Sequence, residues 1–425
     1  AVLFSVHFIM AQNVNHLEVD FIIDGNELAY PLAGGMNAPQ LSEVDLNHDG
    51  LNDLFVFDRV GNIIQTYLNN GSNYQLAPEY VDNFPNLREW VLLRDYNGDE
   101  IMDIFAYSDI PGFHGVIAYR GYYNEVDEIA FERIIFDEQV NLIKVPLISN
   151  PDLETQIYVT NIDYPSVDDL DCDGDLDILT FNINGGYVEL YQNMSVEEGY
   201  GLDTLLFELT NDCWGGFYES GITVAVDLAQ QQGECFDNFA GDPVDFRHAG
   251  STLLTYDADN DGDKELVLGD LNFDNLNFLH NAGDCEEAWM DTQDNAYPSM
   301  NNPTNIPIFP VAFHLDVNND GLKDLLAAPN VKRNGEDKDV LWFYENVGSN
   351  NIPDFEFRQN NFLVGQMVDL GTGADPCFVD YNADGLLDLV VGNNSFYAPF
   401  GAKDPRLFLF KNIGSPTEPK FELID

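Results

Sequence analysis

A nine-residue acidic pattern recurs six times in this 425-residue chain and constrains its fold more than any other feature. The pattern has Asp at positions 1 and 5, Asp or Asn at position 3, and Asp or Glu at position 9. Successive copies start between 50 residues (45 to 95) and 88 residues (169 to 257) apart, and such a period indicates a repeat architecture. The copies, called acidic loops one to six, are DLNHDGLND (45–53), DYNGDEIMD (95–103), DLDCDGDLD (169–177), DADNDGDKE (257–265), DVNNDGLKD (316–324) and DYNADGLLD (380–388).

Short apolar runs flank the acidic loops. Loop one lies between LSEV (41–44) and LFVF (54–57), and a further run, IIQTYLN (63–69), follows after a turn. Such runs, bounded by turn residues, are typical of β-strands. Four strands per unit, repeated without an intervening amphipathic helix, predict an all-β fold, namely a β-propeller of four-stranded blades. Six blades are recognisable, and a seventh is possible if it is completed beyond the chain end.

The chain is expected to divide into three parts. Residues 1–11 (AVLFSVHFIMA) are apolar and precede a polar stretch, so we interpret them as the remnant of a signal peptide and expect a secreted protein. Residues 12–37 are expected to form an N-terminal strand segment that could close the ring, and residues 38–425 the propeller. Long loops on a rigid scaffold are the usual place for binding. Insertions of this kind are expected near 203–249, 281–309, 329–339 and 393–406.

The acidic loops gather hard oxygen donors, and none of their ligand positions is His or Cys. Alternate side chains of a tight turn can point to one centre, and the carbonyl at position 7 adds an oxygen. This donor set favours Ca²⁺ over zinc or copper, and also over Mg²⁺, which retains more water. An EF-hand would need Glu at position 12, where this chain has strand residues such as Val56 and Val391. The sequence therefore predicts up to six Ca²⁺ ions on a β framework.

The predicted calcium ligands occupy positions 1, 3, 5, 7 and 9 of each acidic loop. Glu100 replaces the glycine of acidic loop two, so we expect that loop to bend differently. The ligands are Asp45, Asn47, Asp49, Leu51 and Asp53; Asp95, Asn97, Asp99, Ile101 and Asp103; Asp169, Asp171, Asp173, Asp175 and Asp177; Asp257, Asp259, Asp261, Asp263 and Glu265; Asp316, Asn318, Asp320, Leu322 and Asp324; and Asp380, Asn382, Asp384, Leu386 and Asp388.

Composition excludes several classes of protein. The chain has 74 acidic and 17 basic residues, which gives a formal net charge of −57. Such a surface repels phosphate, so we expect no nucleic-acid partner and no docking on anionic membranes. No run of apolar residues is long enough for a membrane-spanning helix, so membrane insertion is not expected. Hydrophobic residues make up 45% of the chain, which is enough for a large core.

At the acidic loops the chain resembles the FG-GAP/VCBS repeat family, whose propellers are related to the head of integrin α chains. The resemblance rests on the D-x-[DN]-x-D-G-x-x-D pattern, on the strand DLVVG (388–392) and on LFKNIGS (409–415), and it extends over about residues 38–425. It implies a calcium-binding propeller like those of secreted proteins of Bacteroidetes-type bacteria, with partners bound on the face away from the calcium loops. Because the family includes adhesins, lyases and proteins without a known role, the resemblance leaves the function open.

The five cysteines indicate at least one disulfide. Cys213 and Cys235 bracket an insertion, so we predict a disulfide between them in an oxidising compartment, with Cys285 as an alternative partner. Cys377 lies in an expected inner strand and is predicted to be a buried free thiol. Cys172 occupies a non-ligand position of acidic loop three.

The sequence contains no recognisable catalytic motif, so we assign no catalytic residues. Arg247 and His248 form the one cationic pair of catalytic interest, although a structural role is favoured. Trp214, Phe217 and Tyr218 could form a sugar-stacking patch, but their pattern favours core packing of an insertion.

We therefore expect a secreted, calcium-binding propeller that acts as a non-catalytic binding or adhesion module at the cell surface. Its partner would be an extracellular protein or a glycan, and the sequence leaves its oligomeric state open. One alternative is a secreted polysaccharide-acting enzyme, a lyase or hydrolase, on the same scaffold. Another is a structural spacer of a larger surface protein. Convergence of His, Arg, Tyr or Lys in one cleft would favour the enzyme.

Overall fold

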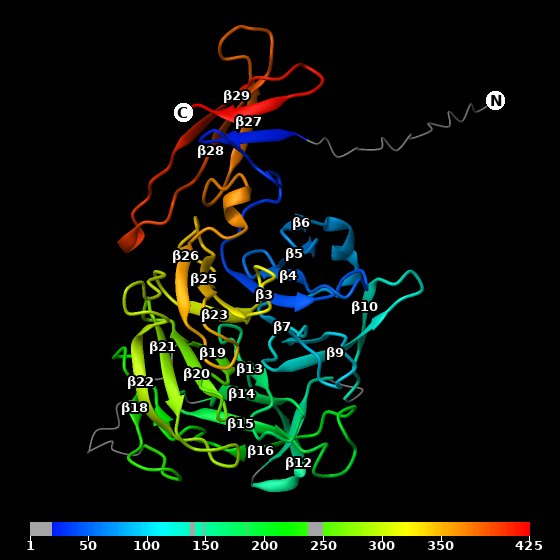
Figure 1. Ribbon diagram of the computed structural model, residues 1–425, viewed down its shortest axis with the longest axis vertical. Helices are drawn as coiled ribbons and strands as arrows, with labels where there is room; N and C mark the ends of the chain where they lie inside the picture. The colour runs from blue at the N-terminus through cyan, green and yellow to red at the C-terminus, as the bar shows by residue number, and fades with distance from the viewer. Residues whose placement is uncertain (1–18, 137–140, 148, 184, 237–249) are drawn as a thin grey trace, which may run out of the picture.

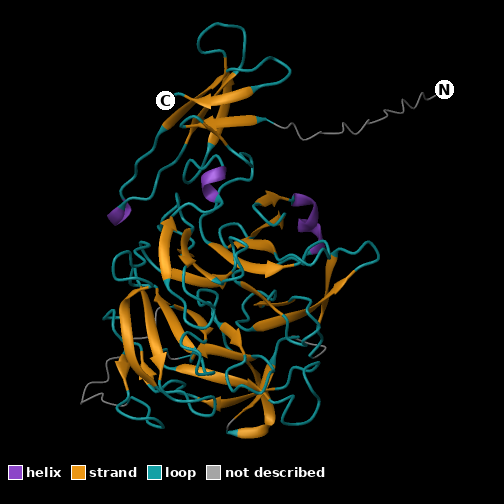
Figure 2. Ribbon diagram, viewed as in Figure 1, coloured by secondary structure: helices purple, strands orange, loops and turns teal. Residues whose placement is uncertain are grey.

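The computed structural model describes residues 19–136, 141–147, 149–183, 185–236 and 250–425, and strands dominate its regular structure (Figure 2). Five sheets contain four antiparallel strands each, in the order of the chain. The first sheet is β3 (Pro39–Val44), β4 (Asp53–Asp58), β5 (Ile63–Asn69) and β6 (Tyr74–Leu76); the second is β7 (Val91–Arg94), β8 (Asp103–Tyr107), β9 (Val116–Tyr123) and β10 (Ile129–Arg133); the third is β13 (Ser166–Asp168), β14 (Asp177–Phe181), β15 (Val188–Asn193) and β16 (Phe207–Asn211); the fourth is β19 (Ser251–Tyr256), β20 (Glu265–Asp270), β21 (Leu276–Asn281) and β22 (Met290–Tyr297); and the fifth is β23 (Pro310–Leu315), β24 (Asp324–Pro329), β25 (Trp342–Asn346) and β26 (Phe355–Gln359).

The sixth sheet has six strands, because the start of the described chain joins its end. Strand β1 pairs in parallel with β30, with Phe21 opposite Phe421. Among the described residues, no helix is both long and apolar enough to cross a membrane. The sixth sheet is β27 (Asp375–Val379), β28 (Asp388–Gly392), β29 (Leu407–Asn412), β30 (Lys420–Leu423), β1 (Asp20–Ile23) and β2 (Asn26–Glu27); the two small hairpins are β11 (Lys144–Leu147) with β12 (Asn150–Gln156), and β17 (Phe217–Tyr218) with β18 (Asp227–Leu228); the 3₁₀ turns are Pro78–Asn83, Val364–Gln366 and Pro399–Gly401.

The second strand of each of the five sheets is buried along its whole length. A strand covered on both faces needs apolar side chains at successive positions rather than alternate ones. This explains runs such as LFVF in β4 and IFAY in β8. The predicted all-β fold with four-stranded units is confirmed, and the arrangement of the sheets is propeller-like (Figure 1).

The first strands of the five sheets face one another and are linked by hydrogen bonds from sheet to sheet. The fifth sheet contacts the first, so the set returns on itself. In chain order the links are Val91 N to Gln40 Oε1 (2.9 Å), Arg94 Nε to Val167 O (3.2 Å), Ser166 Oγ to Thr255 Oγ1 (2.7 Å), Thr252 Oγ1 to Pro310 O (2.8 Å) and Asp316 N to Glu43 Oε1 (3.3 Å).

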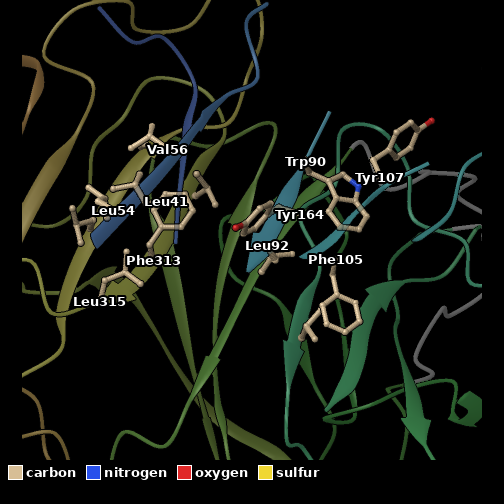
Figure 3. Packing of buried hydrophobic residues seen from close by; sticks show 14 of the residues in the cluster. Leu41, Leu54, Val56, Trp90, Leu92, Phe105, Tyr107, Tyr164, Phe313 and Leu315 are labelled. Carbon is tan, nitrogen blue, oxygen red and sulfur yellow. The ribbon is translucent and has the colours of Figure 1, made fainter. Parts of the chain in front are cut away.

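The largest hydrophobic cluster lies where these first strands meet. Figure 3 shows Leu41 of β3, Leu92 of β7 and Phe313 of β23 in this cluster, with Trp90 and Tyr164 beside them. Trp90 has no exposed side-chain surface. Burial of such side chains stabilises the fold by roughly 1.5–3 kcal/mol each. The core of the five sheets is therefore shared between sheets rather than enclosed within each one.

The sixth sheet stands apart from the other five and has its own cluster, which includes Phe21, Phe410 and Phe421 (Figure 1). Every residue of its first strand, β27, is exposed, and Phe378 is 61% exposed. Cys377 lies on this strand and is free but exposed. The prediction that it is buried was wrong, because no other sheet covers β27 as the first five sheets cover one another's first strands.

Candidate metal centres

All six acidic loops join the first strand of a sheet to the second, and they share one backbone conformation. In each loop the residues at positions 4 and 6 have positive φ, which is the left-handed region that favours glycine. Position 6 is Gly50, Glu100, Gly174, Gly262, Gly321 and Gly385, with φ of 84°, 67°, 100°, 104°, 86° and 88°.

Acidic loop two bends like the others, so the expectation of a different bend at Glu100 was wrong. Glu100 adopts φ 67°, as the glycines do. Its N–H donates to Asp95 Oδ2 at 2.8 Å, which is the bond that Gly50 makes to Asp45 in loop one. The hydrogen bonds of the loop therefore override the steric preference of the side chain, at a cost of about 1–2 kcal/mol.

We predict that Glu100→Gly raises the free energy of unfolding by about 1 kcal/mol, because glycine adopts this conformation without strain. Urea denaturation followed by circular dichroism measures the change. The reciprocal control is Gly174→Ala, which should destabilise the protein by a similar amount. The φ of Gly174 is 100°, and a methyl group there would meet no atom within 4 Å, so the effect would come from the backbone conformation alone. A destabilising effect of Glu100→Gly would contradict this explanation.

The carboxylate at position 9 fixes each loop to its sheet. In acidic loop five, Asp324 Oδ2 accepts a hydrogen bond from Val317 N at 3.2 Å, and Oδ1 accepts one from Asn346 N at 2.9 Å. Asp324 has no exposed surface, and burial raises its pKa to about 7. The same pair of bonds is made by Asp53, Asp103, Asp177 and Asp388.

A buried asparagine near the end of the third strand was missed as a structural residue. Asn346 Nδ2 donates to Lys323 O at 3.1 Å, and its Oδ1 accepts from Gly348 N at 3.0 Å. The side chain thus ties the acidic loop to the following turn. The recurrent Asn-x-Gly or Asn-x-Ser signal could have revealed it. The equivalents are Asn69, Asn193, Asn281 and Asn412, with Gly121 at this place in the second sheet.

Acidic loops one, two, five and six, which have Asn at position 3, satisfy their own polar groups. In loop one, Asn47 Nδ2 donates to Asp49 Oδ2 at 3.0 Å, and Asp45 accepts from the N–H groups of Asp49 and Gly50. The equivalent amide–carboxylate bonds join Asn97 to Asp99, Asn318 to Asp320, and Asn382 to Asp384. A cation would have to compete with these bonds.

Acidic loops three and four, which have Asp at positions 3 and 7, leave buried carboxylate oxygens without a hydrogen-bond partner among the described residues. In loop three these atoms are Asp169 Oδ1, Asp173 Oδ2 and Asp175 Oδ1. In loop four they are Asp263 Oδ1 and Glu265 Oε1. A buried, unpaired carboxylate oxygen is costly, so these two loops are the ones in which a bound cation would compensate unpaired charge.

Among the described residues, the acidic groups close enough to share an ion lie in or beside these two loops. Within each group the candidate ligand atoms lie within 4.8 Å of one another. Two members of these groups were not predicted as ligands. They are Glu197, which follows β15, and His280, which lies on β21. The groups are Asp169, Asp171 and Asp177; Asp171, Asp173 and Glu197; Asp257, Asp259 and Asp261; and Asp259, Glu265 and His280.

Burial raises the pKa of the position-9 carboxylates of acidic loops two, three and four, to about 8 for Asp177 and to about 7 for Asp103 and Glu265. Their ordinary values are 3.8 for Asp and 4.5 for Glu. Since the folded pKa lies above the unfolded one, the stabilising contribution of each protonated carboxyl is complete below about pH 4 and is lost as pH rises to about 8.

We therefore predict that, with EDTA present to remove metal ions, the melting temperature of the protein decreases as the pH rises from about 5 to about 8. A bound cation replaces the proton as the compensating charge, so excess Ca²⁺ should flatten this slope. Calorimetry across this pH range with EDTA and with Ca²⁺ measures both curves. A melting temperature that rises with pH in EDTA would contradict the prediction.

A disulfide joins acidic loop three to the fourth sheet. Cys172, at position 4 of the loop, is bonded to Cys285, which follows β21. Cys172 Sγ lies 3.3 Å from the carbonyl oxygen of Gly262 in acidic loop four. The predicted Cys213–Cys235 disulfide is confirmed, and Cys285 is not its partner. The disulfide thus fixes acidic loop three to the turn after β21, and acidic loop four contacts it through the carbonyl of Gly262.

Several other predicted residues are placed clearly. Trp214 is 3% exposed and Phe217 is fully buried in the cluster between the third and fourth sheets, so core packing is confirmed over a sugar-stacking patch. Arg247 and His248 lie outside the described residues, as do residues 1–11.

Two segments of the chain, which contain acidic loops one, two, five and six, match a known type of repeat. Residues 45–106 and 316–391 match the FG-GAP-like repeat. One similar solved structure concerns recognition of non-reducing terminal N-acetylglucosamine by a lectin of Agrocybe aegerita, at 14% identity and a TM-score of 0.33, covering 91% of this chain and 79% of that one. Another is the Tc holotoxin pore of Photorhabdus luminescens with the TccC3-D651A mutation, at 14% identity and a TM-score of 0.33, covering 90% of this chain and 14% of that one. No curated protein matches the chain.

Proposed function

Because the chain carries FG-GAP-like repeats, we propose that it is a calcium-stabilised binding module that works outside the cell. Acidic loop three is its principal calcium site, and acidic loop four is a second site for a divalent cation. The ions neutralise clustered carboxylates and so hold the loop edge of the sheets in one conformation. The binding or adhesion role uses the rigid surface that results.

The observation that carries the proposal is the set of unpartnered buried oxygens of Asp169, Asp173 and Asp175 in one loop. Three carboxylate oxygens with no proton donor require a positive charge nearby. Oxygen donors in a flexible loop suit Ca²⁺, which accepts six to eight oxygen ligands at about 2.3–2.6 Å. Acidic loop two is less favourable, because Arg120 Nη2 lies 3.7 Å from Asp99 Oδ2 and already supplies a positive charge.

One observation supports an extracellular location. The chain has two disulfides, Cys172–Cys285 and Cys213–Cys235, and disulfides persist in oxidising compartments. Extracellular calcium modules bind in the range of about 10⁻⁴–10⁻³ M. A module of this affinity would bind calcium ions outside the cell, where calcium is abundant, and would release the ions in a chelating medium.

A cleft of about 1300 Å³ is the candidate site for the ligand. It lies between the first sheet and the segments that lead to and from the sixth, and its lining includes Tyr74, Phe362, Gln65, Asn361 and Gln366. Aromatic rings beside neutral amides suit an uncharged polar ligand such as a glycan. Of the residue types that would favour an enzyme, the described lining of the cleft holds Tyr30 and Tyr74 but no His, Lys or Arg. This lining suits binding better than the acid–base chemistry of a lyase.

We predict that EDTA lowers the melting temperature by several degrees. Acidic loop three at tenfold saturation with Ca²⁺ contributes about 1.4 kcal/mol by linkage, and removal of an ion from acidic loop four by EDTA adds a similar amount. Scanning calorimetry with and without Ca²⁺ measures the shift. Asp173→Asn should remove much of it, whereas the matched change Asp320→Asn in acidic loop five should leave most of it. An equal shift in the Asp173→Asn variant and the parent, or no shift in either, would refute the proposal.

Ligand binding is tested separately on a glycan array with the calcium-loaded protein. Tyr74→Ala should abolish any signal that the parent gives, and the exposed Tyr122→Ala, on β9 of the second sheet, should not. Tyr122 is 45% exposed and is not among the residues that line the cleft. Loss of the signal in both variants, or in neither, would remove the cleft from the proposal.

A further inference from the structure

We propose that acidic loop four selects a first-row transition-metal ion, such as Zn²⁺, rather than Ca²⁺. The ligands would be Asp259, Glu265 and His280, whose donor atoms lie within 4.8 Å of one another. The inference rests on the proposed function only in taking the loop as a cation site. It differs in the ion, because one ligand is an imidazole nitrogen.

The orientation of His280 is that of a metal-binding imidazole. Its Nδ1 lies 2.8 Å from Asp291 Oδ1, on the neighbouring strand β22. Its Nε2 points to the loop and lies 3.3 Å from Asp259 Oδ2. A carboxylate that accepts the N–H of one ring nitrogen leaves the other nitrogen free to bind a metal, and this carboxylate–histidine pairing is usual at zinc sites.

The distances fit a small ion. Two ligands at about 2.1 Å from a tetrahedral metal lie about 3.4 Å apart. The separation of 3.3 Å between His280 Nε2 and Asp259 Oδ2 matches this edge. Glu265 would complete a set of three protein ligands, which is the number that sites with an open position use.

Glu265 is available as a ligand because it is one methylene longer than the Asp of the other loops. Its Oε2 accepts a hydrogen bond from Ala258 N at 2.6 Å, as the shorter side chains do at this place. In the other sheets the second oxygen accepts the N–H of the third strand. Glu265 Oε1 has no partner although the residue is fully buried. A buried carboxylate without a donor for its second oxygen, in a group whose ligand atoms lie within 4.8 Å of a ring nitrogen, points to a cation at this place.

The equivalent position in the other sheets shows that the histidine is specific to acidic loop four. In the third sheet this position is Gln192, whose Nε2 donates to Asp171 Oδ2 at 2.8 Å, so a side chain here does reach position 3 of the loop. Imidazole favours Zn²⁺ and related ions, whereas a set of oxygens favours Ca²⁺. The remaining equivalents are Leu68, Arg120, Glu345 and Lys411.

The test uses Co²⁺ as a spectroscopic probe, followed by Zn²⁺ competition and X-ray absorption at the zinc edge. All variants carry Cys377→Ser, which removes the free exposed thiol as a competing ligand. The parent should bind one Co²⁺ with visible d–d absorption, Zn²⁺ should displace it, and the zinc spectrum should contain one imidazole ligand.

His280→Gln supplies the residue that the third sheet uses at this position, so the fold should be kept. It should weaken Co²⁺ binding at least tenfold, and Asp291→Asn should weaken it about 10- to 100-fold. The control is His48→Gln, which changes a loop histidine at a non-ligand position. Equal Co²⁺ affinity in the parent and in His280→Gln would show His280 to be only an ion-paired imidazolium and would overturn the inference.

The outcome is separable from that of the proposed function. Asp173→Asn removes the calcium site of acidic loop three but should leave Co²⁺ binding intact. Retained Co²⁺ binding in a protein that shows no response to Ca²⁺ would contradict the proposed function and support this inference. Loss of Co²⁺ binding in Asp173→Asn would instead count against a separate site in acidic loop four.

Discussion

Replacing Arg59 by alanine is expected to lower the free energy of unfolding by about 3–5 kcal/mol. Arg59 follows β4 and is 2% exposed. Its Nε donates to Glu89 O at 2.6 Å, its Nη2 to Asn161 O at 2.6 Å, and its Nη1 to Asn330 O. These carbonyls precede β7, precede β13 and follow β24, so one side chain joins four of the five sheets. The alanine variant leaves one buried and two partly buried acceptors without this donor, and an unpaired buried acceptor costs about 1–3 kcal/mol.

Urea denaturation followed by tryptophan fluorescence measures this effect. Burial lowers the pKa of Arg59 to about 10, which still leaves it charged at neutral pH. Arg59→Lys keeps the charge, but its donors lie on a single nitrogen and cannot reproduce the planar fork of the guanidinium, so it should lose about half as much stability. The matched control is Arg88→Ala, because Arg88 makes one exposed hydrogen bond to Asp109 O. A loss below about 1 kcal/mol in Arg59→Ala would show that the link between sheets is not energetically important.

Removing the Cys172–Cys285 disulfide is expected to cost about 4–5 kcal/mol, because the bond closes a loop of 113 residues. The double Ser variant should also bind Ca²⁺ more weakly, since Cys172 lies within acidic loop three. Thermal unfolding and calcium titration, with the parent in the same buffer, measure the two effects.

The second disulfide provides the control. Cys213 and Cys235 are 22 residues apart, so their removal should cost only about 3 kcal/mol and leave calcium affinity unchanged. An equal loss of calcium affinity in both double variants would mean that the Cys172–Cys285 bond has no specific role in shaping acidic loop three.

Local patterns in the sequence predicted the fold class well. The run DILTF (177–181) indicates a buried strand, and the acidic residue at its start marks where the loop ends and the strand begins. The same pattern recurs in the second strand of each sheet, so four-stranded units could be predicted with no knowledge of their neighbours. Asp177 was predicted as a metal ligand, but its two hydrogen bonds to Leu170 N and Asn193 N also make it a structural anchor.

Features that depend on distant contacts could not be predicted. The pairing of Cys172 with Cys285 has no local signal, because the loop and its partner belong to different sheets. His280 is a single histidine in an otherwise ordinary strand, and only folding brings it to Asp259. Strand β27 (DPCFV) has the same pattern as β23 (PVAFHL), yet one is exposed and the other buried. Burial there depends on which sheet lies alongside, and the strand's own residues do not encode that.

Anomalous diffraction from crystals grown with Ca²⁺ tests the central claim most directly. The prediction is a calcium peak in acidic loop three, within coordination distance of Asp169 Oδ1, Asp173 Oδ2 and Asp175 Oδ1, the oxygens that have no partner. An empty loop at saturating Ca²⁺, with these oxygens bonded only to water or lysine side chains, would contradict the claim that the acidic loops are cation sites.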